Sequence, residues 1–194
     1  MSGLAIGQTA PSFRLPSGQG TEVGPADYRD KKNLIVWFTK GFACPFCRQQ
    51  MTQLVRGYPQ FQRHDAEVLE IAITTPPRAR VYLQKFQLPF PYLCDPDYRV
   101  HNEWKLASPP YGPLHVVRTM WTGMTTTMPE NDYFKGGPPM DEMRNVMRDD
   151  EMGFFIVDKQ GVVRYAVAGS YIMEVGTRKI PSGAEILAEL AKIN

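Results

Sequence analysis

The sequence lacks both a long apolar segment and an export signal. No run approaches the roughly 18 apolar residues that a membrane-spanning helix needs, so no membrane partner is expected. The opening stretch MSGLAIGQTAPSF has neither the basic region nor the apolar region of a secretory signal. We therefore expect a cytoplasmic protein.

Charge of one sign is also scarce. The formal net charge is +2, with acidic and basic residues mixed along the chain. This balance gives no electrostatic footprint for nucleic acid, which excludes that class of partner. The 43% hydrophobic and 22% charged fractions are typical of a soluble globular protein, and 194 residues fit a single domain over 1–194.

Cysteine is the third scarce feature, yet two of the three cysteines, Cys44 and Cys47, are separated by only two residues. In a reducing compartment, such a pair is more often catalytic or metal-binding than a structural disulfide. A zinc site would need a second CxxC or paired histidines. The remaining candidates are scattered singly: Cys94, His64, His101 and His115. No metal or other cofactor is expected, although metal binding and an inert pair stay open as alternatives to redox chemistry.

The pattern of apolar residues predicts an α/β sandwich with a mixed sheet. The continuous apolar run at 33–39 is typical of a strand buried on both faces. Residues 68–74 are predicted as the second strand, and helical periods follow both segments. Gly57 and Pro59 are expected to end or kink the first helix. Strands are predicted at 12–16, 21–23, 33–39, 68–74, 91–95, 153–158 and 162–169, and helices from about residues 44, 75, 95 and 182 onward. The first two strands would form a small N-terminal β-hairpin.

The cysteine pair falls at the start of the helix that follows the 33–39 strand. Gly41 allows a tight turn and Pro45 suits the first helical position. Cys44 then falls at about the N-cap, with Cys47 about one turn into the helix. The unpaired N–H groups and the dipole at a helix start favour a thiolate there.

The helical face distinguishes the two sulfurs. Cys47 shares its face with Met51 and should point toward the core, whereas Cys44 should be the more accessible sulfur. Arg48 and Lys40 are candidates for stabilising the thiolate. An accessible thiolate beside a sheltered thiol suits thiol–disulfide exchange, in which the outer sulfur attacks and the inner one resolves the mixed disulfide.

Several stretches of the chain resemble the AhpC/TSA branch of the thioredoxin superfamily, the peroxiredoxins and their relatives. These are IGQTAPSFRLP, the apolar strand that runs into the active-site helix, CDPDYRVHNEWKL, and FFIVDKQGVVRYAVAG. The resemblance covers most of the chain. It implies a thioredoxin-like three-layer sandwich with a redox-active cysteine at the start of the helix. It also implies a dithiol electron donor of the thioredoxin or glutaredoxin type, and a disulfide or hydroperoxide substrate.

The active-site pattern of that family is only partly present. The Pro-x-x-x-Thr/Ser-x-x-Cys motif typical of peroxiredoxins would make Cys47 the peroxidatic cysteine, but its Thr position holds Cys44 and its Pro position holds Lys40. The family's peroxide-binding arginine falls at about Met152. The cis-proline of thioredoxins would fall near the same place and is also missing, whereas the CPFC tetrad itself resembles that of glutaredoxins.

Residues 108–150 have no counterpart in that family. The segment is rich in Pro, Gly, Met and aromatic residues and shows no clear period. An adaptable apolar surface of this kind would suit a homodimer contact, a lid over the cysteines or a nonpolar substrate. Arg118, Arg144 or Arg148 could supply the missing guanidinium. A plain elaborated loop is the simpler alternative.

Three functions remain open from the sequence. The leading hypothesis is thiol–disulfide exchange, with Cys44 as nucleophile and Cys47 as resolving thiol. The second is hydroperoxide reduction, with Cys47 as peroxidatic and Cys44 as resolving thiol. The third is a non-catalytic module that binds a metal or a protein partner. The candidate substrate contacts flank the cysteine pair: Phe42, Pro45, Phe46 and Met152.

Overall fold

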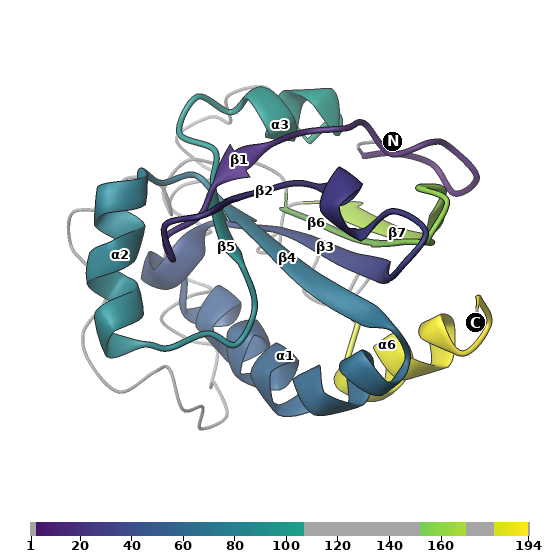
Figure 1. Cartoon of the computed structure of the whole chain (residues 1–194). Coiled ribbons are helices and arrows are strands. Elements are labelled where there is room, and N and C mark those ends of the chain that lie inside the picture. The colour runs from purple at the N-terminus through teal and green to yellow at the C-terminus, as the bar shows by residue number, and fades with distance from the viewer. Residues whose placement is uncertain (1–2, 107–151, 170–180, 194) are drawn as a thin grey trace, which may run out of the picture.

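The computed structural model of the chain describes residues 3–106, 152–169 and 181–193. Its centre is a five-stranded mixed sheet in the order β5-β4-β3-β6-β7 (Figure 1). The strands are β3 (Asn33–Thr39), β4 (Ala66–Ala72), β5 (Tyr92–Cys94), β6 (Met152–Val157) and β7 (Val163–Gly169). β3, β4 and β5 run parallel, whereas β6 is antiparallel to both β3 and β7. The predicted mixed sheet is confirmed.

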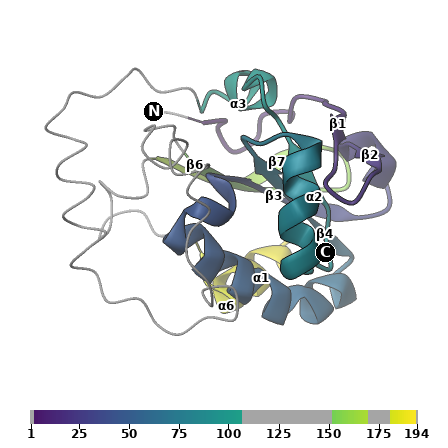
Figure 2. The same ribbon diagram turned by 90° about the vertical axis from the view of Figure 1, so that its left-hand side faces the viewer.

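Helices and the N-terminal segment cover the two faces of this sheet. The helices are α1 (Pro45–Arg63), α2 (Pro76–Lys85), α3 (Arg99–Glu103) and α6 (Gly183–Leu190), and a two-stranded hairpin is formed by β1 (Leu15–Pro16) and β2 (Glu22–Val23). Figures 1 and 2 agree that α1 and α6 lie on one side of the sheet, with α3 and the hairpin on the other. The expected three-layer sandwich with an N-terminal hairpin is therefore confirmed.

The sheet separates two hydrophobic cores. One core packs β-sheet side chains such as Trp37 and Phe154 against α1, α2 and α6, and it includes all three cysteines. The other packs Val36 and Phe38 against α3 and the N-terminal segment. Every residue of β3 is buried, which explains why its sequence shows an unbroken apolar run instead of alternation.

Neighbouring strands place one row of side chains beneath α1. Trp37 of β3 lies opposite Phe154 of β6 and opposite Glu70 of β4. Glu70 in turn lies opposite Tyr92 of β5. Residues in register on adjacent strands point to the same face of a sheet, so a single carboxyl group sits in an otherwise aromatic row.

The first helix is longer than its sequence predicts. α1 continues through Gly57 and Pro59 to Arg63, so neither residue ends it. A Cβ atom on Gly57 would lie 2.5 Å from the ring of Phe61, and glycine is therefore what lets this turn of helix close onto that ring. Phe61 and Leu54 are both completely buried, and their packing outweighs the backbone hydrogen bond that Pro59 cannot donate.

Helix ends were predicted more accurately. Thr75 is the N-cap residue of α2, with Pro76 at the first helical position. α6 begins after Ser182, where a helix start was predicted, and a capping box is present there: the Glu185 N–H donates to Ser182 Oγ at 3.3 Å, and the Ser182 N–H donates to Glu185 Oε2 at 2.7 Å. Such local signals depend on residues three or four positions apart, so sequence alone reveals them.

Several expectations fall on residues outside those described. They include the atypical segment 108–150, with Arg118, Arg144 and Arg148, so its roles as dimer contact, lid or source of a guanidinium stay predictions. The assignment of 1–194 to one domain also stays a prediction. Among the helices of the described ranges, none combines the length and the apolar character needed to cross a membrane.

Candidate active site at the Cys44–Cys47 pair

A tight turn carries the chain from the sheet to the cysteines. β3 ends at Thr39, a short 3-10 turn spans Gly41–Ala43, and α1 begins directly after Cys44. Gly41 has φ +76°, a left-handed conformation that glycine adopts without steric cost. Its N–H donates to Thr39 Oγ1 at 3.2 Å, and the Cys44 N–H donates to the Gly41 carbonyl at 3.2 Å. The predicted turn at Gly41 is confirmed.

Cys44 caps the first turn of α1 through its sulfur. Its backbone is extended, with φ −84° and ψ 118°, and its side chain accepts the Cys47 N–H at 3.3 Å. The predicted N-cap position is therefore confirmed. A sulfur in this place faces the unpaired N–H groups at the positive end of the helix dipole, which favours negative charge on it.

Cys44 is the more exposed of the two cysteines, as expected, but it is not the accessible thiol that the sequence predicts. Only 3% of Cys44 is exposed, and Cys47 is completely buried. The reason is that the 3-10 turn itself is buried: Phe42 and Ala43 pack into the core, and the Cys44 sulfur turns back onto the helix that it caps. The two sulfurs therefore differ less in exposure than in their hydrogen-bond partners.

The surroundings of Cys47 favour its protonated form. Burial, above all, raises the pKa of Cys47 well above its ordinary value, and the neighbouring Cys44 side chain raises it further. The Thr39 hydroxyl and the Lys40 backbone N–H act in the opposite direction, but their effect is smaller. Cys47 is thus the sulfur that resists ionisation.

A second sulfur atom contacts Cys47 from the sheet. Met152, the first residue of β6, accepts a hydrogen bond from Cys47, with 3.6 Å between Sγ and Sδ. Met152 is 5% exposed and belongs to the core beneath α1. β6 begins at Met152, one residue before the strand predicted at 153–158, and a substrate contact by its thioether stays a prediction.

Arg48 and Lys40 approach the pair in different ways. Arg48 is 2% exposed. Burial lowers the pKa of its guanidinium, and the nearby Cys44 and Cys47 counteract that effect, which places the cation within electrostatic range of both sulfurs. Lys40 acts on Cys47 through its backbone N–H. The stabilising role predicted for the two side chains stays a prediction.

Phe42, one of the predicted substrate contacts, packs inside the core, and a substrate contact by its side chain stays a prediction. Its ring stacks on Phe86 at 5.5 Å between centroids and contacts Tyr82 and Tyr92 at 5.5 and 5.1 Å. With 1% exposure, it anchors the active-site turn to α2 and β5. The physical reason is its place in the turn, which directs the ring into the space between α2 and the sheet.

Two other predicted substrate contacts remain untested. The backbone of Pro45 and Phe46 forms the start of α1, but their side chains lie outside what the structure describes. Pro45 occupies the first helical position, as its fixed φ and missing N–H favour. A substrate contact by either side chain stays a prediction.

Cys94 lies on the same face of the sheet as the pair but two strands away. It is the last residue of β5 and lies opposite Ala72 of β4, which in turn lies opposite Thr39 of β3. All three cysteines are buried, and none of them forms a disulfide. Within the described ranges, no group of three or more His, Cys, Asp or Glu side chains could hold a metal ion.

Sequence analysis missed two polar groups in this region. Thr39 ends the apolar strand, and its hydroxyl faces Cys47, a role that its position five residues before the pair does not reveal. Glu70 interrupts the otherwise apolar run at 68–74, yet it is completely buried. A charged residue inside such a run is a signal that could have drawn attention to it.

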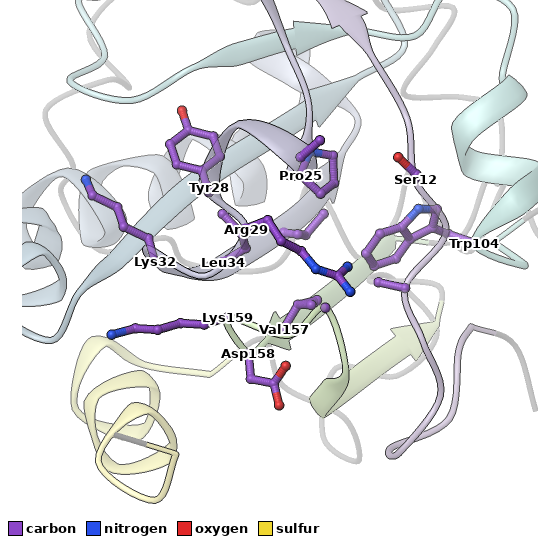
Figure 3. Close-up of a pocket in the computed structure, with 14 residues that line it drawn as sticks. Ser12, Pro25, Tyr28, Arg29, Lys32, Leu34, Trp104, Val157, Asp158 and Lys159 are labelled. Carbon is purple, nitrogen blue, oxygen red and sulfur yellow. The ribbon is translucent and has the colours of Figure 1, made fainter.

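A pocket of about 330 Å³ lies on the opposite face of the sheet (Figure 3). Trp104 lies at one end, Lys32 and Lys159 at the other, and Arg29 reaches across between them. Its apolar floor belongs to the core that faces α3, whereas the cysteines belong to the core that faces α1. Because the sheet separates the two, this pocket cannot present a substrate to the cysteine pair.

Comparisons with known proteins connect this site to one family. A model of the AhpC/TSA family matches residues 6–166. Peroxiredoxin Q, chloroplastic, of Populus jackii is 28% identical over 108 residues, which cover 56% of this chain and 50% of that protein. A bcp protein of Haemophilus influenzae, provisionally named a peroxiredoxin, is 28% identical over 141 residues, covering 70% of this chain and 90% of the relative.

Solved structures extend the similarity to the fold. The crystal structure of peroxidoxin BcpB from Mycobacterium tuberculosis superposes with a TM-score of 0.66 at 16% identity, covering 98% of this chain and 99% of that one. Peroxiredoxin Q of Xanthomonas campestris gives 0.64 at 14% identity, covering 93% and 90%. At these identities the likeness shows the fold alone, and it confirms the expected thioredoxin-like architecture.

Proposed function

The chain belongs to the AhpC/TSA family, and from that premise we propose that it is a thiol-dependent oxidoreductase whose working group is the Cys44–Cys47 dithiol. The activity itself is a proposal because the chain spans only 50% and 58% of the length of the first two curated relatives that it matches. We infer that its main reaction is thiol–disulfide exchange.

The observation that carries this proposal is the unequal surroundings of the two sulfurs. Cys44 accepts an N–H at the start of a 19-residue helix, where negative charge is favoured. Cys47 is completely buried, and burial raises its pKa. One sulfur suited to the thiolate form beside one kept as a thiol is the arrangement that dithiol exchange requires.

The reaction follows from this difference. The Cys44 thiolate attacks one sulfur of a substrate disulfide, forms a mixed disulfide and expels the other sulfur as a thiolate, which takes up a proton. Cys47 then loses its proton and attacks the Cys44 sulfur, which forms the Cys44–Cys47 disulfide and releases the second substrate thiol. Two electrons pass to the substrate, and a dithiol donor of the thioredoxin or glutaredoxin type would return them.

The burial of Cys44 sets a condition on this reaction. With 3% of the residue exposed, a substrate sulfur reaches it only if the substrate seats closely against the turn at Gly41–Ala43. An extended disulfide on a flexible peptide or a small molecule meets this condition more easily than a disulfide inside a folded domain. We therefore propose accessible disulfides as the substrate class.

Single-cysteine variants test the assignment of roles. Cys47→Ser should trap a stable mixed disulfide on Cys44 with a small disulfide such as 5,5′-dithiobis(2-nitrobenzoate), whereas Cys44→Ser should lose most of the exchange rate. Cys94→Ala is the matched control, because Cys94 lies two strands from β3. If Cys44→Ser reduced the disulfide at the rate of the unmodified protein, Cys44 would not be the nucleophile.

Hydroperoxide reduction is the second candidate, favoured by the peroxiredoxin names of the relatives. Here the Cys47 thiolate would attack the terminal oxygen of a hydroperoxide, becoming a sulfenic acid as the alcohol leaves. Cys44 would then attack that sulfur and expel water, forming the same disulfide. Dimedone trapping in Cys44→Ser distinguishes the candidates: rapid labelling of Cys47 by peroxide at neutral pH would favour this reaction over exchange.

The setting in which the protein works also remains a proposal. We expect a cytoplasmic protein that does not bind nucleic acid and that forms a homodimer if the segment 108–150 supplies a contact. Size-exclusion chromatography with light scattering would measure the oligomeric state. A monomer at all concentrations would exclude the dimer without affecting the proposed chemistry.

A further inference from the structure

Cys47 is held between two kinds of neighbour. Thr39 and Lys40, at the end of β3, offer it a hydroxyl and a backbone N–H, both of which can donate to a thiolate. Met152, at the start of β6, offers only a thioether, at 3.6 Å between Sδ and Sγ. These contacts come from two different strands, so β6 contributes to the chemistry of a cysteine 105 residues away in the sequence.

A thioether is a hydrogen-bond acceptor without a proton of its own. It can therefore accept the S–H of a neutral cysteine, but it has nothing to donate to a cysteine thiolate. Because both residues are buried, water does not readily replace the missing donor at this contact. Met152 consequently favours the neutral form of Cys47 over the charged form.

Of the remaining groups around Cys47, Cys44 also favours the neutral form, whereas the donors at the end of β3 favour the thiolate. On α1, Cys44 contacts it from the N-cap and the Arg48 guanidinium acts on it at longer range. On β3, Thr39 and Lys40 offer the donors already described. Glu70 of β4 lies on the same face, one strand away, in register with Trp37. Among these described neighbours, Met152 is the residue of β6 that accepts the Cys47 S–H.

We propose that Met152 is a positioning residue that accepts the Cys47 S–H, holds Cys47 as a thiol and thereby reserves the first attack on substrate for Cys44. The assignment rests on the proposed dithiol chemistry and deepens it. Once Cys44 has entered the mixed disulfide and lost its charge, it no longer raises the pKa of Cys47 electrostatically, so Cys47 releases its proton to the solvent and attacks the Cys44 sulfur as a thiolate. Met152 therefore favours disulfide exchange over direct peroxide attack by Cys47.

The test uses a protein in which Cys47 is the single thiol, made by Cys44→Ala and Cys94→Ala. The Raman S–H stretching band of this protein reports both the hydrogen bond and the protonation state of Cys47. Met152→Leu keeps the apolar volume but removes the acceptor. Met152→Gln has a similar length and adds an N–H donor.

The two variants should change the band in different ways. Met152→Leu should move the S–H band to higher frequency, because the acceptor is lost, and the band should disappear at slightly lower pH than before, because the neutral form of Cys47 loses a hydrogen bond. Met152→Gln should raise the thiolate fraction at a given pH by about tenfold, the scale of one hydrogen bond to a charged group. Its peroxide oxidation should quicken by only about threefold, because nucleophilicity falls with thiol pKa.

Two results would overturn the proposal. An S–H band unchanged in Met152→Leu would mean that Met152 does not accept this proton. Equal shifts of the titration in Met152→Leu and Met152→Gln would mean that packing, and not hydrogen bonding, controls Cys47. Thermal unfolding of each variant checks that it folds. If Met152→Gln does not fold, Met152→Thr replaces it in the test, because threonine offers a hydroxyl donor.

The same measurements separate this proposal from the proposed function. Disulfide reduction by the chain with all its cysteines tests dithiol exchange, and the band of the single-thiol protein tests Met152. If the chain with all its cysteines fails to reduce disulfides while the single-thiol protein shows the expected band shifts, the proposed function is rejected and the Met152 contact is retained. Normal exchange without those shifts would reject the Met152 contact alone.

Discussion

Trp37 and Glu70 lie side by side on the parallel strands β3 and β4, buried in the core beneath α1. Neither the indole nitrogen of Trp37 nor either carboxylate oxygen of Glu70 has a hydrogen-bond partner among the described residues. Burial alone raises the pKa of Glu70 well above its ordinary value. The core that holds the dithiol therefore also holds a carboxyl group whose surroundings favour its neutral form.

Glu70 should make the protein less stable as the pH rises. The carboxyl of the unfolded chain ionises near pH 4.3, whereas the folded one stays protonated far above that value. Unfolding then releases a proton, so the free energy of unfolding declines from about pH 4.3 upward until the folded carboxyl ionises. Urea denaturation of Glu70→Gln between about pH 5 and pH 8 should show a flatter profile than the unmodified protein.

Glu70→Met extends the same test. It removes the buried polar atoms as well as the charge, and it should raise the free energy of unfolding at neutral pH by about 1–3 kcal/mol. Parallel pH profiles for the unmodified protein and both variants would contradict this account of Glu70. A destabilised Glu70→Met would indicate a partner for the carboxyl outside the residues described.

Asp95 should contribute stability of the opposite pH dependence. Burial by itself would raise its pKa, but hydrogen bonds from His101 and Val100 outweigh that effect and lower it. Asp95 Oδ2 lies 2.8 Å from His101 Nδ1 and accepts the backbone N–H groups of Val100 and His101 at 3.0 Å. Its stabilisation is complete above about pH 3.9, the unfolded value, and is lost as the pH falls through the lower folded value.

Asp95→Asn measures that contribution. It should lower the free energy of unfolding at pH 7 by about 1–3 kcal/mol, and the difference should shrink below about pH 4. Asp97→Asn, two residues away and exposed, is the matched control and should change stability by less than about 0.5 kcal/mol. A constant difference down to pH 2 would show that the charge of Asp95 is not responsible.

Gly41 should be required for the active-site turn. With φ +76°, an alanine at this position would be strained by about 1–2 kcal/mol, and the turn would relax away from its place beneath α2. Gly41→Ala should therefore lower both stability and the rate of disulfide reduction. Gly183→Ala is the control, since nothing lies within 4 Å of its added Cβ; a similar loss in both variants would reject a special role for the turn.

Phe42 should couple the active-site turn to α2. Phe42→Ala removes a buried ring and should cost about 3–5 kcal/mol of stability. Because the Phe42 and Phe86 rings stack at 5.5 Å, a double-mutant cycle should give a coupling of about 0.5–1.5 kcal/mol. The same cycle between Phe42 and Phe155, on the opposite face of the sheet, should give none.

Local signals in the sequence predicted the scaffold well. The run at 33–39 became β3 residue for residue, and α6 begins directly after Ser182, where a helix start was predicted. α1 was misjudged because Gly57 and Pro59 are weak helix formers when considered alone. Their tolerance depends on the packing of Phe61, which is a tertiary effect.

The sequence by itself determined where the dithiol lies. A strand, a glycine turn, a capping cysteine and a helix follow one another within about fifteen residues, and each element depends on near neighbours. The resemblance to the AhpC/TSA family also rests on short segments of this kind. These features are local, so they can be recognised without knowing how the chain packs.

Only the tertiary structure decided the surroundings of the two sulfurs. Whether Cys44 is exposed depends on how Phe42 seats against α2 and β5, and the partner of Cys47 is Met152, 105 residues away. Burial and hydrogen bonding, which control thiol ionisation, arise where distant segments meet. The sequence therefore located the reactive pair, whereas packing between β3, β6 and α1 assigned each sulfur its chemical character.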